Sequence, residues 1–244
     1  MKLFVSTLIL VLFSTSTAFA YENVVPEFFY QPELEETAVE GGVSYSDSSA
    51  DNANEQIGVR GSVAHGLTHN LALRLGTSYT LEDDADGFNN LNSDIIGHNK
   101  ISGSFKLYYG VFGSLTPDKG PSTQRFSSSH SFSPYIGVST HMDNKAFGAR
   151  FLYNTVSTSN DVLGNFSYDA TVFGEMNVKD SYLAGASLDY NQLSQSDADF
   201  VTLNFYGRVY LSNFTLLPRI NYGYALDSQF DDSYAVELAA RFLF

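Results

Sequence analysis

The sequence has no cysteine and few basic residues. Without cysteine, disulfide bonds cannot hold the fold together. The chain carries 13 Lys and Arg against 27 Asp and Glu, which gives a formal net charge of −14. Nucleic-acid binding needs Lys and Arg clustered on one surface. The composition therefore excludes a disulfide-held fold and argues against nucleic acid as a partner.

Long apolar runs are also missing, apart from one at the N-terminus. The stretch from Leu3 to Phe13 is largely apolar, and Ala18-Phe19-Ala20 fits the A-x-A site at which signal peptides are cleaved. This stretch has 11 residues, whereas a membrane-spanning helix needs about 20. We therefore expect residues 1–20 to be a secretory signal peptide and the mature chain to begin near Tyr21. No later stretch is long and apolar enough for a transmembrane helix.

The sequence instead shows alternation of apolar and polar residues with a period of two. Residues 234–244 place Tyr234, Val236, Leu238 and Phe242 on one face of an expected strand. Similar alternation recurs along the chain, in residues 39–45, 57–63, 71–79, 101–107, 109–115, 134–142, 147–155, 166–176, 182–190, 201–211, 214–226 and 234–244. No helical periodicity persists over a useful window, so we predict an all-β fold. The mean hydropathy of −0.11 fits a transmembrane barrel, in which lipid-facing and lumen-facing residues cancel in the average.

The connections between these segments alternate in length. Short connections lie at residues 66–70, 143–144, 178–181 and 212–213, and longer polar ones lie at residues 46–54, 82–97, 116–129, 157–164, 194–199 and 227–232. Outer-membrane barrels have short periplasmic turns and longer outer loops. A soluble β-sandwich would mix loop lengths at both ends. The pattern therefore favours an antiparallel transmembrane β-barrel over residues 37–244.

With these features the chain resembles Gram-negative outer-membrane β-barrel proteins of the porin or transporter kind. The resemblance implies that the terminal strand carries the signal read by the barrel-assembly machinery, through Tyr234, Leu238, Phe242 and Phe244. It also implies an outer-membrane location, with membrane lipid and lipopolysaccharide as neighbours. Residues 21–36 precede the first strand, and we expect them either to lie in the periplasm or to enter the barrel as a plug.

The number of strands follows from parity. Bacterial barrels have an even number of strands because both termini lie on the periplasmic side. The alternation of short and long connections can be followed forward from Thr37 and backward from Phe244. The two assignments agree only if residues 99–116 hold two strands with a tight turn near Tyr108 and Tyr109. We therefore predict twelve strands, with ten as the alternative.

The alternation also assigns the two faces of each strand. Apolar outward positions are expected at Val59, Leu73, Phe105, Val138, Phe151, Val172, Leu188, Phe205, Ile220 and Leu238. The charged residues expected to line the lumen are Arg60, Arg74, Lys100, Lys106, Arg150, Asp169, Glu175, Asp189, Arg208, Arg219, Glu237 and Arg241, together with Glu40. Basic residues outnumber acidic ones in this set by eight to five. They form either a basic stripe along an open pore or ion pairs that fill a closed lumen. Small inward residues such as Gly137, Gly148 and Ser187 are expected to leave room for solutes.

Catalytic and metal-binding patterns are weak. Ser139 and His141 lie in the reverse order from the His-x-Ser pair of outer-membrane acyl hydrolases, and no carboxylate is placed to orient the histidine. The acidic stretch from Glu82 to Gly87 imitates part of a calcium loop but lacks its final glutamate. We therefore predict no catalytic residue, no metal site and no cofactor. The sequence favours a channel or transporter for small solutes. The alternatives are a closed structural or surface-interaction barrel that works through its acidic outer loops and, third, a membrane-embedded hydrolase.

Overall fold

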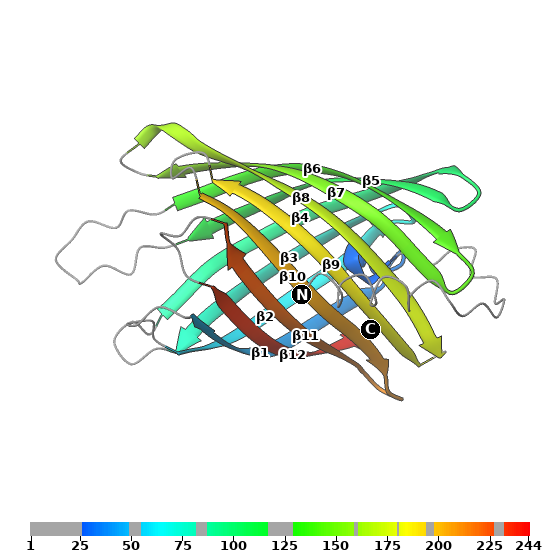
Figure 1. Ribbon diagram of the computed structural model, residues 1–244. Coiled ribbons are helices and arrows are strands. Elements are labelled where there is room, and N and C mark those ends of the chain that lie inside the picture. The colour runs from blue at the N-terminus through cyan, green and yellow to red at the C-terminus, as the bar shows by residue number, and fades with distance from the viewer. Residues whose placement is uncertain are drawn as a thin grey trace.

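A computed structural model describes residues 26–48, 55–81, 87–116, 129–158, 161–179, 181–193, 198–226 and 232–244. Within these ranges the chain forms a closed antiparallel barrel of twelve strands (Figure 1). No helix in them is long and apolar enough to cross a membrane. The expected fold class and strand number are confirmed. The expected signal peptide, residues 1–20, lies outside the described residues.

The strands follow one another around the barrel in sequence order. They are β1 Thr37–Ser48, β2 Gln56–Thr68, β3 Leu71–Leu81, β4 Gly87–Ser102, β5 Phe105–Thr116, β6 Ser129–Met142, β7 Lys145–Thr158, β8 Asp161–Lys179, β9 Tyr182–Leu193, β10 Ala198–Tyr210, β11 Thr215–Ala225 and β12 Ser233–Leu243, preceded by the short 3-10 helix η1, Glu27–Phe29. Pairing of β1 with β12 closes the ring, with Val43 opposite Leu238. The backbone N–H of Thr37 donates to Phe244 O at 3.0 Å, and that of Phe244 donates to Thr37 O at 2.9 Å. The last residue is therefore fixed at the same end of the barrel as the start of β1.

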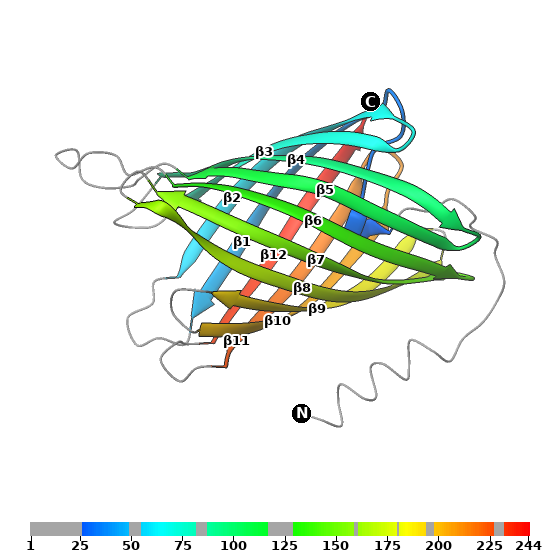
Figure 2. The ribbon, with the colours of Figure 1, turned by 90° about the horizontal axis from the view of Figure 1, so that it is seen from above.

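We call this end the short-turn end, because the turns between β2 and β3, β4 and β5, and β6 and β7 lie there (Figure 2). Backbone hydrogen bonds join turn residues at this rim to the neighbouring strands β4 and β8. His98 N donates to Asn70 O at 2.9 Å, and Asn177 N donates to Asn144 O at 2.9 Å. The strands are thus held in register down to their last residues.

The turn between β4 and β5 lies at Gly103 and Ser104. The expected turn at Tyr108 and Tyr109 is wrong, and so is the expected loop over residues 82–97, because β4 begins at Gly87. Tyr108 is instead a fully buried residue in the middle of β5.

The cause of this error is the composition of β4. Asn90, Asn92 and Asp94 are its inward residues, as their pairing with inward residues of β3 and β5 shows. The outward residues Leu91 and Ile95 are exposed. A strand with a polar lumenal face, rich in asparagine, has the composition of a loop.

The apolar positions that the sequence assigned to the outer face are where they were expected. The side chains of Val59, Phe105, Phe151, Val172, Leu188, Phe205, Ile220 and Leu238 are exposed, and those of Leu73 and Val138 are half-buried. A strand surrounded by lipid must present apolar side chains outward, since a charge at the bilayer midplane costs about 2–4 kcal/mol for Arg or Lys. The outer surface therefore fits a membrane-spanning barrel.

The buried apolar cluster lies inside the barrel. It consists of Phe29, Ala72, Ile96, Tyr108, Tyr135, Leu152 and Phe173, with Phe28 packed against it. Six of these residues come from strands, whereas Phe28 and Phe29 come from η1. Figures 1 and 2 both show η1 within the ring of strands. The site is therefore built from the strand wall and from the segment that precedes it.

Candidate functional site

The charged residues expected in the lumen all lie on one face of the strands. Residues directly opposite one another on paired strands point to the same side of a sheet. Glu40 is opposite Arg241, Arg219 is opposite both Glu237 and Tyr206, and Lys100 is opposite Lys106. Continued around the ring, these pairings place Arg60, Arg74, Lys100, Lys106, Arg150, Asp169, Glu175, Asp189, Arg208, Arg219, Glu237 and Arg241 on the inward face.

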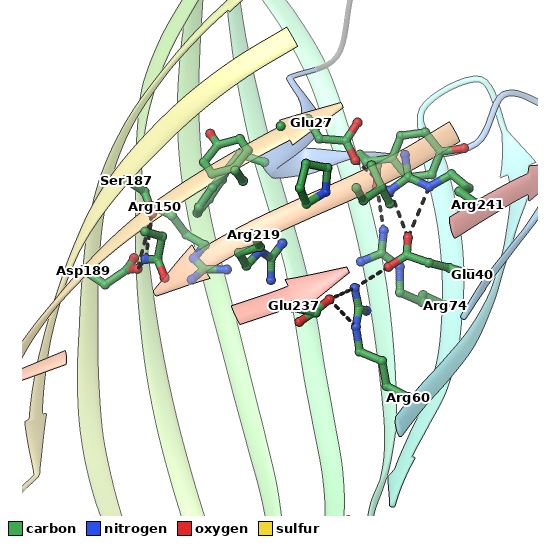
Figure 3. A pocket seen from close by; sticks show the side chains of 17 residues that line it. Glu27, Glu40, Arg60, Arg74, Arg150, Ser187, Asp189, Arg219, Glu237 and Arg241 are labelled. Carbon is green, nitrogen blue, oxygen red and sulfur yellow. Dashed lines mark hydrogen bonds and ion pairs between the residues drawn. The ribbon is translucent and has the colours of Figure 1, made fainter. Parts of the chain in front are cut away.

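Many of these side chains surround one cavity of about 300 Å³ (Figure 3). Its lining includes the five arginines Arg60, Arg74, Arg150, Arg219 and Arg241 and the four carboxylates Glu27, Glu40, Asp189 and Glu237. The charges fall into a paired group and a group without carboxylate partners.

The paired group joins β1, β2 and β12. Arg60 Nη2 lies 2.6 Å from Glu40 Oε1, and Arg60 Nε donates to Glu237 Oε1 at 2.6 Å. Arg241 Nη2 lies 3.0 Å from the other oxygen of Glu40. These contacts form a continuous ion-pair network on the wall, at the place where the first and last strands close the barrel. Because such charges are removed from bulk water, each depends on its partners.

Glu27 extends this network from the N-terminal segment. Its Oε1 lies 2.7 Å from Arg241 Nη2, and its Oε2 lies 3.1 Å from Arg208 Nη1. The three side chains are only 6–9% exposed. Sequence reasoning missed Glu27 because it precedes the first strand. The available signal was the surplus of basic over acidic residues expected in the lumen, which requires a counter-charge from outside the strands.

The N-terminal segment is also held through its backbone. Glu175 accepts hydrogen bonds from the N–H groups of Glu27 at 2.9 Å and Phe28 at 2.7 Å. Arg74 Nη2 donates to the carbonyl oxygen of Tyr30 at 3.1 Å. Four strands therefore supply polar groups for one short turn of chain: β8, β3 and, through Arg208 and Arg241, β10 and β12.

Aromatic contacts complete the attachment. The ring of Phe29 stacks on Tyr108 with centroids 4.0 Å apart, and that of Phe28 stacks on Phe173 at 4.5 Å. The guanidinium of Arg241 lies 3.5 Å from the ring centroid of Tyr30. Burial raises the pKa of the Tyr30 hydroxyl to about 12, so this ring carries no charge.

Glycines on the wall make space for these rings. A Cβ placed on Gly137 would lie 2.5 Å from Phe29 Cζ, and one on Gly148 would lie 2.5 Å from Phe173 Cε1. The room that small inward residues were expected to leave for solutes is thus filled by phenylalanine rings at these two positions.

Arg74, Arg150 and Arg219 have no carboxylate within ion-pair distance among the described residues. Arg150 donates weakly to Thr171 Oγ1 at 3.5 Å and lies over the ring of Phe28 at 4.9 Å. The inward carboxylates of the neighbouring strands β8 and β9 are engaged elsewhere. Asp169 accepts from Asn191, Asp189 accepts from Asn204, and Glu175 holds the N-terminal segment. The lumen therefore contains both arrangements that the sequence left open, ion pairs and uncompensated arginines.

Comparison with solved structures identifies the architecture. The chain superposes on the NanC porin with a TM-score of 0.62 and 12% identity, over 84% of this chain and 98% of that one. It superposes on the COG4313 outer-membrane channel of Pseudomonas putida with a TM-score of 0.61 and 14% identity, over 91% and 100%. The chain has the outer-membrane porin fold.

A third structure, the KdgM porin in complex with disordered oligogalacturonate, matches this porin-fold barrel with a TM-score of 0.54 and 10% identity, over 84% and 98% of the two chains. No protein-family model and no curated relative matches the sequence. At these identities the likeness concerns the fold, and it bears out the resemblance to outer-membrane barrel proteins.

The expected assembly residues of this porin-fold barrel lie on its outer face. Tyr234, Leu238, Phe242 and Phe244 are 43%, 50%, 41% and 77% exposed. Phe244, at the short-turn rim, is the most exposed of the four. That the barrel-assembly machinery recognises these four residues remains a prediction.

Ser139, of the candidate hydrolase pair, lies within the described residues. Its side chain faces the lumen and donates a hydrogen bond to the hydroxyl of Tyr108 at 3.3 Å. Among the residues that the structure describes, no cluster of three or more His, Asp and Glu side chains could hold a metal ion. The acidic stretch at residues 82–86 lies outside the described residues.

Proposed function

We propose that the protein is a channel for small solutes in the outer membrane of a Gram-negative bacterium, and that its lumen favours anions. The observation that carries this proposal is the cavity lined by Arg74, Arg150 and Arg219, for which no described carboxylate is a partner. The porin fold supports the channel part of the proposal. Export by the signal peptide, insertion by the barrel-assembly machinery and contact with lipopolysaccharide belong to the same proposal.

The preference for anions follows from the charge of the wall. Five arginines and four carboxylates line the cavity, which leaves one excess positive charge. Fixed charges in a channel with low-dielectric walls raise the local concentration of ions of opposite sign. The acidic outer loops repel anions at the mouth of the barrel. Selection for anions therefore has to come from the arginines that line the cavity. The cavity volume of about 300 Å³ is at the lower end of the range for small-molecule sites.

Reversal potentials across planar bilayers under a salt gradient test this proposal. Replacing Arg150 and Arg219 together by Ser removes two uncompensated charges, and we expect the reversal potential to shift toward cation selectivity. The Arg150→Lys, Arg219→Lys variant keeps the charge and serves as the matched control, with selectivity close to that of the wild type. A reversal potential that does not change in the serine variant would refute anion selection by these residues.

A closed structural or surface-interaction barrel is the second candidate. The observation that favours it is the N-terminal segment inside the lumen, with Phe29 only 2% exposed. On this hypothesis the wild type and all arginine variants would show no conductance, and function would depend on the acidic outer loops. Against the hydrolase alternative, the Ser139 hydroxyl donates its hydrogen bond to Tyr108.

A further inference from the structure

Glu27 occupies a position that a bound anion could take. Each of its carboxylate oxygens contacts a different arginine, Oε2 with Arg208 and Oε1 with Arg241. Arg208 and Arg241 are 6% and 5% exposed, so water does not compete freely for them. Paired guanidinium groups are well suited to a planar carboxylate, because their N–H donors match its geometry. The pair therefore has the features of a carboxylate-binding site whose ligand comes from the same chain.

The arginine pair has a donor that Glu27 does not use. Arg208 Nε is buried, and it has no hydrogen-bond partner among the described residues. Buried donors are normally paired, and an exception calls for an explanation. Glu27 contacts Arg208 through Nη1 alone. A free carboxylate, which has no tether to the backbone, could approach the other edge of the guanidinium group and accept from Nε of Arg208.

Backbone-to-backbone hydrogen bonds join the segment that carries Glu27 to the strand wall at Gly66. Glu35 N donates to Gly66 O at 3.0 Å, and Gly66 N donates to Glu36 O at 3.0 Å. These bonds fix the chain to the end of β2. None of the twelve strand pairings involves residues 26–33. This segment can therefore leave the lumen about the anchor at residues 34–36 without opening the barrel.

We propose that Arg208 and Arg241 form a carboxylate-binding site that Glu27 occupies in cis, so that residues 26–31 are an autoinhibitory plug that a small organic carboxylate displaces. The plug closes the short-turn half of the lumen, where Phe28 and Phe29 pack against Phe173 and Tyr108. The proposal rests on the channel function proposed above and adds to it a solute class and a closed state.

The free energy needed to undock the plug depends on whether another anion can replace Glu27. Removing one partner from a buried ion pair leaves uncompensated charge and is strongly unfavourable. Departure of Glu27 into solvent would leave Arg208 without a described carboxylate partner and Arg241 with Glu40 alone, unless another anion replaces it. An arriving carboxylate restores the pairing and, through Arg208 Nε, adds a hydrogen bond. The plug is therefore expected to remain docked in the absence of such solutes and to be released in their presence.

The experiment measures plug position directly, by thiol labelling in addition to conductance. The native chain has no cysteine, and Pro26, next to Glu27, is fully buried, so Pro26→Cys reports on the plug with a single thiol. In the folded mature protein, millimolar sodium acetate should speed labelling of this cysteine by a bulky maleimide, compared with sodium chloride at equal ionic strength. Adding Glu27→Gln should raise the rate about tenfold or more without acetate, because the ion pairs are lost. Acetate should then have no further effect.

Glu35→Gln in the same Pro26→Cys background is the matched control, since it removes an equal charge from an exposed residue of the same segment. It should label at the parent rate. Equal labelling of the Glu27→Gln and Glu35→Gln variants would overturn the role of Glu27. Labelling that acetate leaves unchanged in the parent would overturn the displacement of the plug by carboxylates.

Conductance separates this inference from the channel function. If the proposal holds, Glu27→Gln should show larger or more frequent open events in planar bilayers than the wild type, and acetate should increase the open events of the wild type. If labelling shows that the plug is released but no variant conducts, the channel function fails while the plug stands. If the wild type conducts fully and both glutamine variants match it in labelling and conductance, the plug fails while the channel stands.

Discussion

Phe29 is expected to be the main apolar anchor of the N-terminal segment. Its side chain is 2% exposed and contacts Tyr108 face to face, and Phe173 and Phe28 edge to face. Truncating a buried phenylalanine to alanine costs about 3–5 kcal/mol. Because these contacts join the segment to the wall, Phe29→Ala should weaken docking by that amount and raise the undocked population about a hundredfold or more.

The assay is thiol labelling of Pro26→Cys with and without Phe29→Ala. When docking is fast relative to labelling, the rate follows the undocked population, so the rise in rate reports the loss of docking free energy. Phe105→Ala removes a ring of the same size from the lipid-facing side of β5 and should leave the rate unchanged. Heat-modified migration in gels checks that the barrel itself stays folded. Unchanged labelling of the Phe29→Ala variant in a folded barrel would show that stacking on Tyr108 does not hold the segment.

Two further predictions concern assembly and orientation. Phe244→Ala should lower the amount of heat-modifiable barrel in the outer membrane, because it removes the last aromatic side chain at the rim; normal levels would contradict a role for Phe244 in assembly. Cysteine at Glu55, at the end opposite the short turns, should react with an impermeant reagent on intact cells, whereas cysteine at Asn144 should not; the reverse pattern would invert the barrel in the membrane.

The strand wall could be predicted because lipid imposes a strict rule on it. Outward side chains in the bilayer have to be free of charge and are mostly apolar, so positions such as Val172 and Ile220 mark the outer face, and the residues between them mark the lumen. The same rule fixes the end of β12, where Phe242 and Leu238 face outward and Arg241 faces inward. A strand has only two faces, so one correct assignment determines all others on that strand.

The limits of this reasoning appear where the lumenal face is made of residues typical of loops. In β4, Asn90, Asn92 and Asp94 lower the apparent strand propensity, and only every second residue is apolar. Asp94 accepts a hydrogen bond from the hydroxyl of Tyr135 at 3.0 Å on β6, a contact between strands that are not neighbours in the sheet. Contacts of this kind across the lumen leave no local signal in the sequence. Period-two alternation therefore predicts a beginning of β4 that is later in the chain than the observed one at Gly87.

The docking of Glu27 could not be predicted from period-two alternation, because a segment inside a barrel is not part of the strand pattern. Two features of the sequence indicate such a segment. Eight basic residues against five acidic ones are expected on the inward face, and an acidic stretch that contains phenylalanine precedes the first strand. The wall cannot balance itself, since a change of register would bring charge to the lipid face. Counter-charge has to come from solutes or from another part of the chain, and Glu27 supplies it to Arg208 and Arg241. Arg74, Arg150 and Arg219 are left for solutes, so the same imbalance accounts both for the segment in the lumen and for the anion preference that we propose.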